Sequence, residues 1–226
     1  MNSNTIISYL TDLENNNDRE WYHAHKGEYR QASAEFEQLL GRLIEKISEY
    51  DSSVAMCIPR ELTFKLVRDT RFSHDKSPYN PAFRAHISGA GKLPVPVGYY
   101  VFIKPGGSFL GGGLFADMFP EATAMVREYI SGNGSEWEKI INSPEFSGLF
   151  RVKGNSLKNV PKGFEKDHPQ AEFLKFKSWY AEYPVPDEAF DDIEAFAAMA
   201  ADIFRIIKPF NDYLNKALDG FAMPSR

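Results

Sequence analysis

The sequence predicts an α+β fold in which a mid-chain antiparallel sheet is covered by helices from both ends of the chain. Apolar residues recur at helical spacing up to about residue 47 and again from about residue 187. Between residues 61 and 115 they alternate instead with polar residues, in short runs separated by glycine and proline. We expect one domain over residues 1–226, because the chain has no repeat, no low-complexity tract and no linker-like segment.

Two helices are expected before the sheet. Ile6, Ile7, Leu10 and Leu13 share one face of a helix over residues 5–13. Three asparagines end this helix, and Asn17 or Asp18 is placed to cap the next one. The second helix is expected to run for about eight turns, since one apolar stripe extends from Trp21 to Ile47.

Alternating or β-rich runs predict strands over residues 62–67, 82–88, 99–104 and 108–115. The Pro-Gly-Gly sequence at 105–107 predicts a hairpin turn between the last two. Sequential strands joined by short turns pair in antiparallel fashion, which gives the sheet its expected type.

Helices return after the sheet. They are expected over residues 120–130 and 135–141, and a turn-rich region follows at 150–168. Residues 173–183 are expected to form a helix and then an edge strand. The last long helix is expected from residue 187 to about 207, with Pro209 interrupting it because proline lacks an N–H donor.

Composition restricts the partners. The formal net charge is −5 and the isoelectric point near 5.6, whereas binders of nucleic acid or acidic membranes are typically basic, so we expect neither partner. Cys57 is the one cysteine, which excludes an intrachain disulfide. No basic and apolar leader begins the sequence and no run approaches about 20 apolar residues, so a cytoplasmic location is expected.

Four runs in order carry a resemblance to a known family: NNNDREWYHAHKGEY, LVRDTRFSHDKSPYN, GYYVFIKPGGSFLGGGLF and LKNVPKGFEKDHP. With these runs the chain resembles the bacterial DUF2461 family, a domain of unknown function, over about residues 5–215. The resemblance implies one domain and assigns no catalytic residue, cofactor or ligand. Asn80 stands where the family's second run is expected to have a lysine.

The second of these runs is the candidate site. Arginine forks grip carboxylate or phosphate through paired hydrogen bonds, so Arg68 and Arg71, helped by Lys76 and Tyr79, predict a pocket for a small anionic ligand. If the domain is an enzyme, His74 or Asp75 is the candidate general acid or base.

The alternative is a non-catalytic interaction module. In that interpretation Asp69 and Asp75 pair with the arginines and hold the fold, while an aromatic surface meets a protein partner. Buried, mutually paired arginines would favour the module, and unpaired donors at a cleft would favour the ligand site.

Other motifs do not support a specific chemistry. The glycines at 106, 107 and 111–113 lack both the P-loop ending and the strand-turn-helix context of dinucleotide sites; they favour a bulged hairpin or, as an alternative, an open face for a substrate. Ser73 and Lys76 match a Ser-x-x-Lys pattern without its partner motifs. The histidine spacings match no metal site, so we expect neither a metal nor a cofactor.

Overall fold

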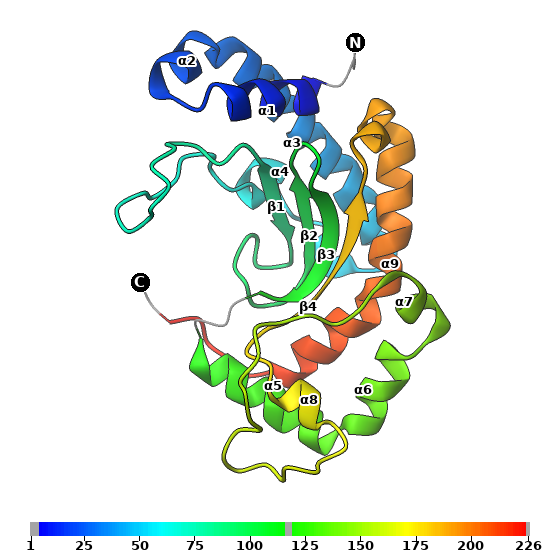
Figure 1. The fold of residues 1–226 in the computed structure, drawn as a ribbon. Helices are drawn as coiled ribbons and strands as arrows, with labels where there is room; N and C mark the ends of the chain where they lie inside the picture. Colours follow the sequence, from blue (N-terminus) through cyan, green and yellow to red (C-terminus); the bar gives the residue numbers. More distant parts are fainter. Residues whose placement is uncertain (1–4, 116–118, 225–226) are drawn as a thin grey trace. The chain divides into compact units, whose positions relative to one another are not determined.

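The computed structural model describes residues 5–115 and 119–224 and has the expected α+β fold (Figure 1). The described residues form a four-stranded antiparallel sheet whose spatial order follows the chain. The strands are β1 (Phe83–Ile87), β2 (Tyr99–Ile103), β3 (Ser108–Leu114) and β4 (Trp179–Val185).

By its internal contacts the chain divides into two compact units, each assembled from three separate segments. The first unit contains the chain up to Lys92, Tyr100–Leu110 and Pro184–Asp202. The second contains Leu93–Tyr99, Gly111–Tyr183 and the chain from Ile203 onward. Unit boundaries fall within β2, β3 and β4, so neither unit is a continuous stretch of sequence, and the single domain stays a prediction.

The first unit begins with helices α1 (Thr5–Asn15), α2 (Arg19–Ala24) and α3 (Lys26–Ser48). The apolar faces of α1 and α3 pack together, and α3 also contacts β1, where Phe36 stacks on Phe83 with 5.3 Å between ring centroids. The unit also contains η1 (Ser52–Val54), α4 (Pro59–Leu62) and η2 (Asp187–Asp191).

The prediction of one unbroken helix after Asp18 is wrong. Asp18 does cap the helix, accepting a hydrogen bond of 2.8 Å from the Trp21 N–H, but the helix is broken at His25. His25 has a ψ of 26° rather than the helical value near −42°, and its ring stacks on Trp21 while Nδ1 lies 2.8 Å from the Trp21 carbonyl oxygen. The local side-chain contacts therefore compete with helix continuation, which the apolar stripe alone does not reveal.

The strand predicted over residues 62–67 does not form: Leu62 ends α4, and the residues after it make isolated bridges only. Thr63 bridges Ala85, and Val67 bridges Tyr79. The segment that faces it contains Pro78 and Pro81, which have no N–H to donate. A continuous ladder of hydrogen bonds cannot form opposite these prolines. Alternation therefore indicated where the chain pairs with its neighbours, but no regular strand forms.

The second unit contains α5 (Pro120–Gly132), α6 (Gly134–Ile141), α7 (Pro144–Leu149), α8 (Ala171–Leu174) and the C-terminal part of α9 (Ile193–Ala217). Trp137, Phe146 and Phe210 form its aromatic core. The predicted interruption at Pro209 is wrong, because α9 continues through it. Pro209 is exposed, and burial of Phe210 and Tyr213 on the following turn stabilises the helix beyond it.

The glycines of β3 permit close packing. Gly113 has a φ of 104°, and a Cβ at this position would lie 2.3 Å from the Trp179 carbonyl oxygen. At Gly111, a Cβ would lie 2.6 Å from the Ala181 carbonyl oxygen. Protein atoms fill the space beside these glycines, so their role is the approach of β4 rather than an opening for a substrate.

In the part of the chain that the structure describes, the helices are too short or too polar to cross a bilayer.

Candidate functional site

The basic run forms a loop, residues 67–79, that belongs to the first unit and projects from it beside β1 (Figure 1). Its base is held by the Val67–Tyr79 bridge and by backbone hydrogen bonds on either side of it. The Arg68 N–H donates to the Pro78 carbonyl (2.9 Å), and the Asn80 N–H donates to the Leu66 carbonyl (2.7 Å). The two ends of the loop are therefore fixed, although the loop has no regular secondary structure.

Asn17 joins this base to the helix connection 62 residues earlier. Its Nδ2 donates to the Tyr79 carbonyl (3.0 Å) and its Oδ1 accepts from the Tyr79 N–H (3.1 Å). The amide thus pairs with the Tyr79 backbone as a neighbouring strand would. The Tyr79 side chain is 5% exposed and stacks on Tyr22 with 4.3 Å between ring centroids. The first and second runs of the resemblance meet at this clamp.

Arg68 and Asp75 face each other across the loop. The Arg68 side chain is 28% exposed; its guanidinium donates to Asp75 and, more weakly, to the Ser73 hydroxyl at 3.3 Å. Asp75 also accepts from the hydroxyl (2.6 Å) and the N–H (2.9 Å) of Ser77. The Ser77 hydroxyl, followed by Arg68, holds the pKa of Asp75 well below its usual range. Asp75 is consequently a carboxylate throughout the neutral range.

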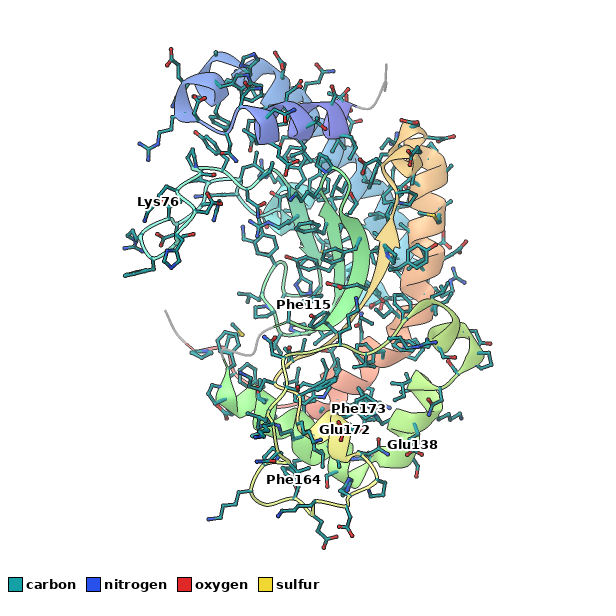
Figure 2. All side chains as sticks on the ribbon, in the orientation of Figure 1. Lys76, Phe115, Glu138, Phe164, Glu172 and Phe173 are labelled. Carbon is teal, nitrogen blue, oxygen red and sulfur yellow. The ribbon has the colours of Figure 1, made fainter. Side chains whose placement is uncertain are left out.

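Arg71 makes a separate, more exposed pair. Its side chain is 77% exposed and donates to both carboxylate oxygens of Asp69, with 2.6 Å between Nη2 and Oδ2. This pairing lowers the pKa of Asp69 and raises the pKa of Arg71. Lys76 donates to the Thr70 carbonyl (3.0 Å), and it is labelled on the projecting loop in Figure 2.

A polar cleft of about 430 Å³ lies at the base of the loop. Lys104, which directly follows β2, lies 3.2 Å from Glu14 of α1 and adds a second cation to the cleft. Two cations and two carboxylates therefore balance in the lining. The residues that line it include Glu14, Asn17, Arg68, Asp75, Tyr79 and Lys104.

The structure thus brings together three of the six residues predicted from the sequence: Arg68, Asp75 and Tyr79. Arg71, His74 and Lys76 are on the exposed part of the loop and do not line this cleft. Sequence reasoning missed Glu14, Asn17 and Lys104. The sequence indicates Asn17 only as a helix cap, and Glu14 and Lys104 are single charges whose position depends on tertiary packing.

A family model described as "Conserved hypothetical protein (DUF2461)" matches residues 5–213. The chain belongs to the DUF2461 family. No curated protein and no solved structure matches it. The matched range contains every residue of the cleft, so the clamp between Asn17 and Tyr79 lies inside the DUF2461 domain.

The titratable side chains outside the cleft do not suggest a metal centre or an activated nucleophile. Over residues 5–115 and 119–224, no three His, Cys, Asp or Glu side chains gather closely enough to ligate an ion. Cys57 is half-buried and donates to the Ser88 carbonyl (3.1 Å), and burial raises the pKa of its thiol. A thiol in this state is a weak nucleophile.

Proposed function

We propose that this DUF2461 domain acts in the cytoplasm and that its cleft binds a small ligand carrying a phosphate or carboxylate group. One observation supports this most strongly: Arg68 and Lys104, from two distant segments, both line a polar cleft large enough for a metabolite. Arg68 supplies a fork for two acceptor oxygens and Lys104 a point charge on the other segment.

Binding of an anion here takes the form of exchange. Asp75 and Glu14 already contact the two cations, so the incoming group replaces one of these carboxylates rather than filling an unpaired site. Both carboxylates are about half exposed, and water solvates them once they are displaced. A ligand with two oxygens in one plane competes best, because it can engage both nitrogens of the Arg68 fork.

The cleft has a binding role, and a catalytic role would depend on His74 and Asp75. A carboxylate whose pKa is lowered is a weak general base at neutral pH, so Asp75 orients Arg68 better than it accepts protons. His74 is exposed and does not line the cleft, and it reaches a bound ligand only if the loop rearranges.

The test is a thermal-shift screen with inorganic phosphate, phosphorylated metabolites and carboxylates on three proteins. A ligand present at about 100 times its Kd raises the unfolding free energy by roughly 2.7 kcal/mol, which is several degrees in a domain of this size. The shift should be present in the wild type and lost in Arg68→Gln. Arg71→Gln is the matched control, since Arg71 belongs to the same loop and lies outside the cleft.

Loss of the shift in Arg71→Gln, with Arg68→Gln unaffected, would move the site to the exposed residues of the loop. No shift with any anion, together with strong destabilisation in Arg68→Gln, would contradict the proposal.

The interaction module remains the second candidate, because Phe72 is 95% exposed on the loop. Arg71 lies over its ring at 5.9 Å, and both arginines of the loop are paired within it. An exposed aromatic on a braced loop is suited to insertion into a partner's pocket. For this candidate, Phe72→Ser should abolish partner capture from the source cells and leave the thermal stability unchanged.

A further inference from the structure

We infer that the ligand of the cleft is a mononucleotide, whose base stacks on the aromatic outer face of β2 and β3 while its phosphate lies at Arg68 and Lys104. This inference rests on the proposed function and adds the class of ligand. Two observations carry it: a row of near-parallel rings on β2 and β3, and the position of Lys104, which follows this row along the chain and lines the cleft.

The cations of the cleft belong to a basic segment of the chain. Between Leu62 and Leu114 the chain has seven Lys or Arg residues and two Asp residues, whereas the whole chain has a net charge of −5. Arg68 and Lys104 of this segment line the cleft, where Asp75 and Glu14 balance their charge. A phosphate is therefore held by these two groups after exchange with a carboxylate, and not by a general excess of positive charge.

Aromatic rings lie beside this charge. Side chains alternate along β2, so that Tyr99, Val101 and Ile103 are buried and Tyr100 and Phe102 are half-exposed on the other face. Phe109 of β3 is stacked with both of them: its centroid is 4.8 Å from that of Phe102 and 6.2 Å from that of Tyr100, with interplanar angles of 14° and 15°. A flat ring system can extend such a near-parallel set by offset stacking.

The face continues across β1. Phe64 lies 6.2 Å from Tyr100, and the Arg84 guanidinium lies over Phe64 at 5.5 Å. Arg84 Nε is buried and has no hydrogen-bond partner among the residues that the structure describes. Because Nε is inaccessible to solvent, Arg84 extends the aromatic face through the contact of its guanidinium with Phe64 and not as a hydrogen-bond donor to the ligand.

Lys104 connects the two parts. It follows Phe102 by two residues along the same extended run, about 7 Å farther on at the usual rise of a strand. Its Nζ pairs with Glu14 in the cleft. A ligand with a phosphate at Lys104 therefore has the ring of Phe102 within reach of its other end.

The charge distribution favours a mononucleotide over a nucleic acid strand. Outside the basic segment the chain has a net charge of −10, so a long polyanion leaving the cleft meets repulsion. Cross-strand aromatic pairs also stabilise sheets without any ligand. The experiment must therefore separate a ring that binds a base from a ring that only stabilises the sheet.

The experiment is titration calorimetry of the full chain with adenosine 5′-monophosphate, ribose 5-phosphate and a ten-residue single strand of deoxyadenosine. The monophosphate should bind about fivefold or more tightly than ribose 5-phosphate, because stacking of one base on an aromatic side chain corresponds to an affinity ratio of about 5–150. Phe102→Leu should remove most of this advantage and leave the affinity for ribose 5-phosphate unchanged. Phe72→Leu is the control for an exposed ring elsewhere, and Phe109→Leu replaces Phe102→Leu if the latter does not fold.

The outcomes separate the two proposals. If the monophosphate and ribose 5-phosphate bind equally, or if Phe102→Leu and Phe109→Leu keep the full advantage, the mononucleotide inference is overturned and the anion cleft stands. If the strand binds more tightly per molecule than the monophosphate, the ligand is nucleic acid and the inference is again overturned. If none of the probes binds, and the broader anion screen is also negative, both proposals fail.

Discussion

The clamp between Asn17 and the Tyr79 backbone gives the sharpest test of how the site is held together. Replacement of Asn17 by Ala removes two hydrogen bonds, of 3.0 and 3.1 Å. The N–H and carbonyl of Tyr79 then lose these partners in a residue that is only 5% exposed. A net contribution of about 0.5–1.5 kcal/mol for each bond predicts that the unfolding free energy falls by about 1–3 kcal/mol. For a chain of this length the melting temperature should then fall by roughly 2–12 °C.

Two assays report this change. Urea denaturation gives the loss of global stability, and hydrogen exchange of the Tyr79 amide gives the opening of the clamp itself. Exchange should accelerate by about 5–150-fold, the factor that corresponds to the same free energy. Asn16→Ala is the matched control, because Asn16 is the preceding asparagine and makes one exposed bond to the Asp12 carbonyl. Its effect should stay within about 0.5 kcal/mol.

Asn17→Asp separates the donor from the acceptor. The carboxylate can still accept from the Tyr79 N–H, but it cannot donate to the Tyr79 carbonyl. The variant should therefore be destabilised at neutral pH and recover relative to wild type in acid, where a protonated carboxyl can donate. If Asn17→Ala matches wild type in both assays, the amide does not hold the loop and this account of the site is refuted.

Three further predictions concern burial, backbone and charge. Tyr9→Phe should raise the unfolding free energy in urea by up to about 1–3 kcal/mol, because the buried Tyr9 hydroxyl has no partner among the described residues; a loss above about 0.5 kcal/mol would contradict this. Gly113→Ala should lower the melting temperature by several degrees through its φ of 104° and the contact with the Trp179 carbonyl, whereas Gly132→Ala, with nothing within 4 Å, should not. The folded-state pKa of Asp75 is lowered, so the stabilisation that this carboxylate provides should be complete above its unfolded pKa of about 3.9 and should disappear as the pH falls through the lower folded value. Wild type and Asp75→Asn should therefore differ in unfolding free energy at pH 6 and converge in acid. A constant difference between them would exclude this linkage.

The sequence was sufficient for the fold class because periodicity reports directly on burial. The prediction of strands at 82–88, 99–104 and 108–115 is confirmed by β1, β2 and β3 to within a residue or two at each end. β2 alternates between buried and half-buried residues, whereas β1 and β3 are buried at all but one position each. Alternation therefore indicated β2, and β-rich runs bounded by turn residues indicated the other two. Individual contacts decide the break at His25 and the continuation of α9 through Pro209. The spacing of apolar residues does not report on such contacts.

The candidate site was predictable only in part, for a related reason. Arg68 and Asp75 are close in sequence, so a local charge pattern was enough to indicate that they interact. Asn17 and Tyr79 are separated by 62 residues, and an amide that pairs with a backbone leaves no trace in charge or hydropathy. Lys104 could not be predicted as a site residue for the same reason, since only the folded structure places this single lysine beside Glu14 in the cleft.

The internal pairing of the loop and its proposed role in binding are compatible, because the pairs lower the entropic cost of binding. A ligand that must order a free loop loses about 1–2 kcal/mol for each residue whose backbone becomes fixed. Here the Asn17 clamp, the Val67–Tyr79 bridge and the Arg68–Asp75 pair have ordered the loop already. An incoming anion then exchanges with a solvent-accessible carboxylate on a preformed support, which is the less costly route to affinity. Loss of the clamp should therefore also affect binding: Asn17→Ala, although Asn17 carries no charge, should weaken binding of any anion that Arg68 holds. Unchanged affinity in a folded Asn17→Ala protein would show that the order of the loop and the capture of the ligand are independent.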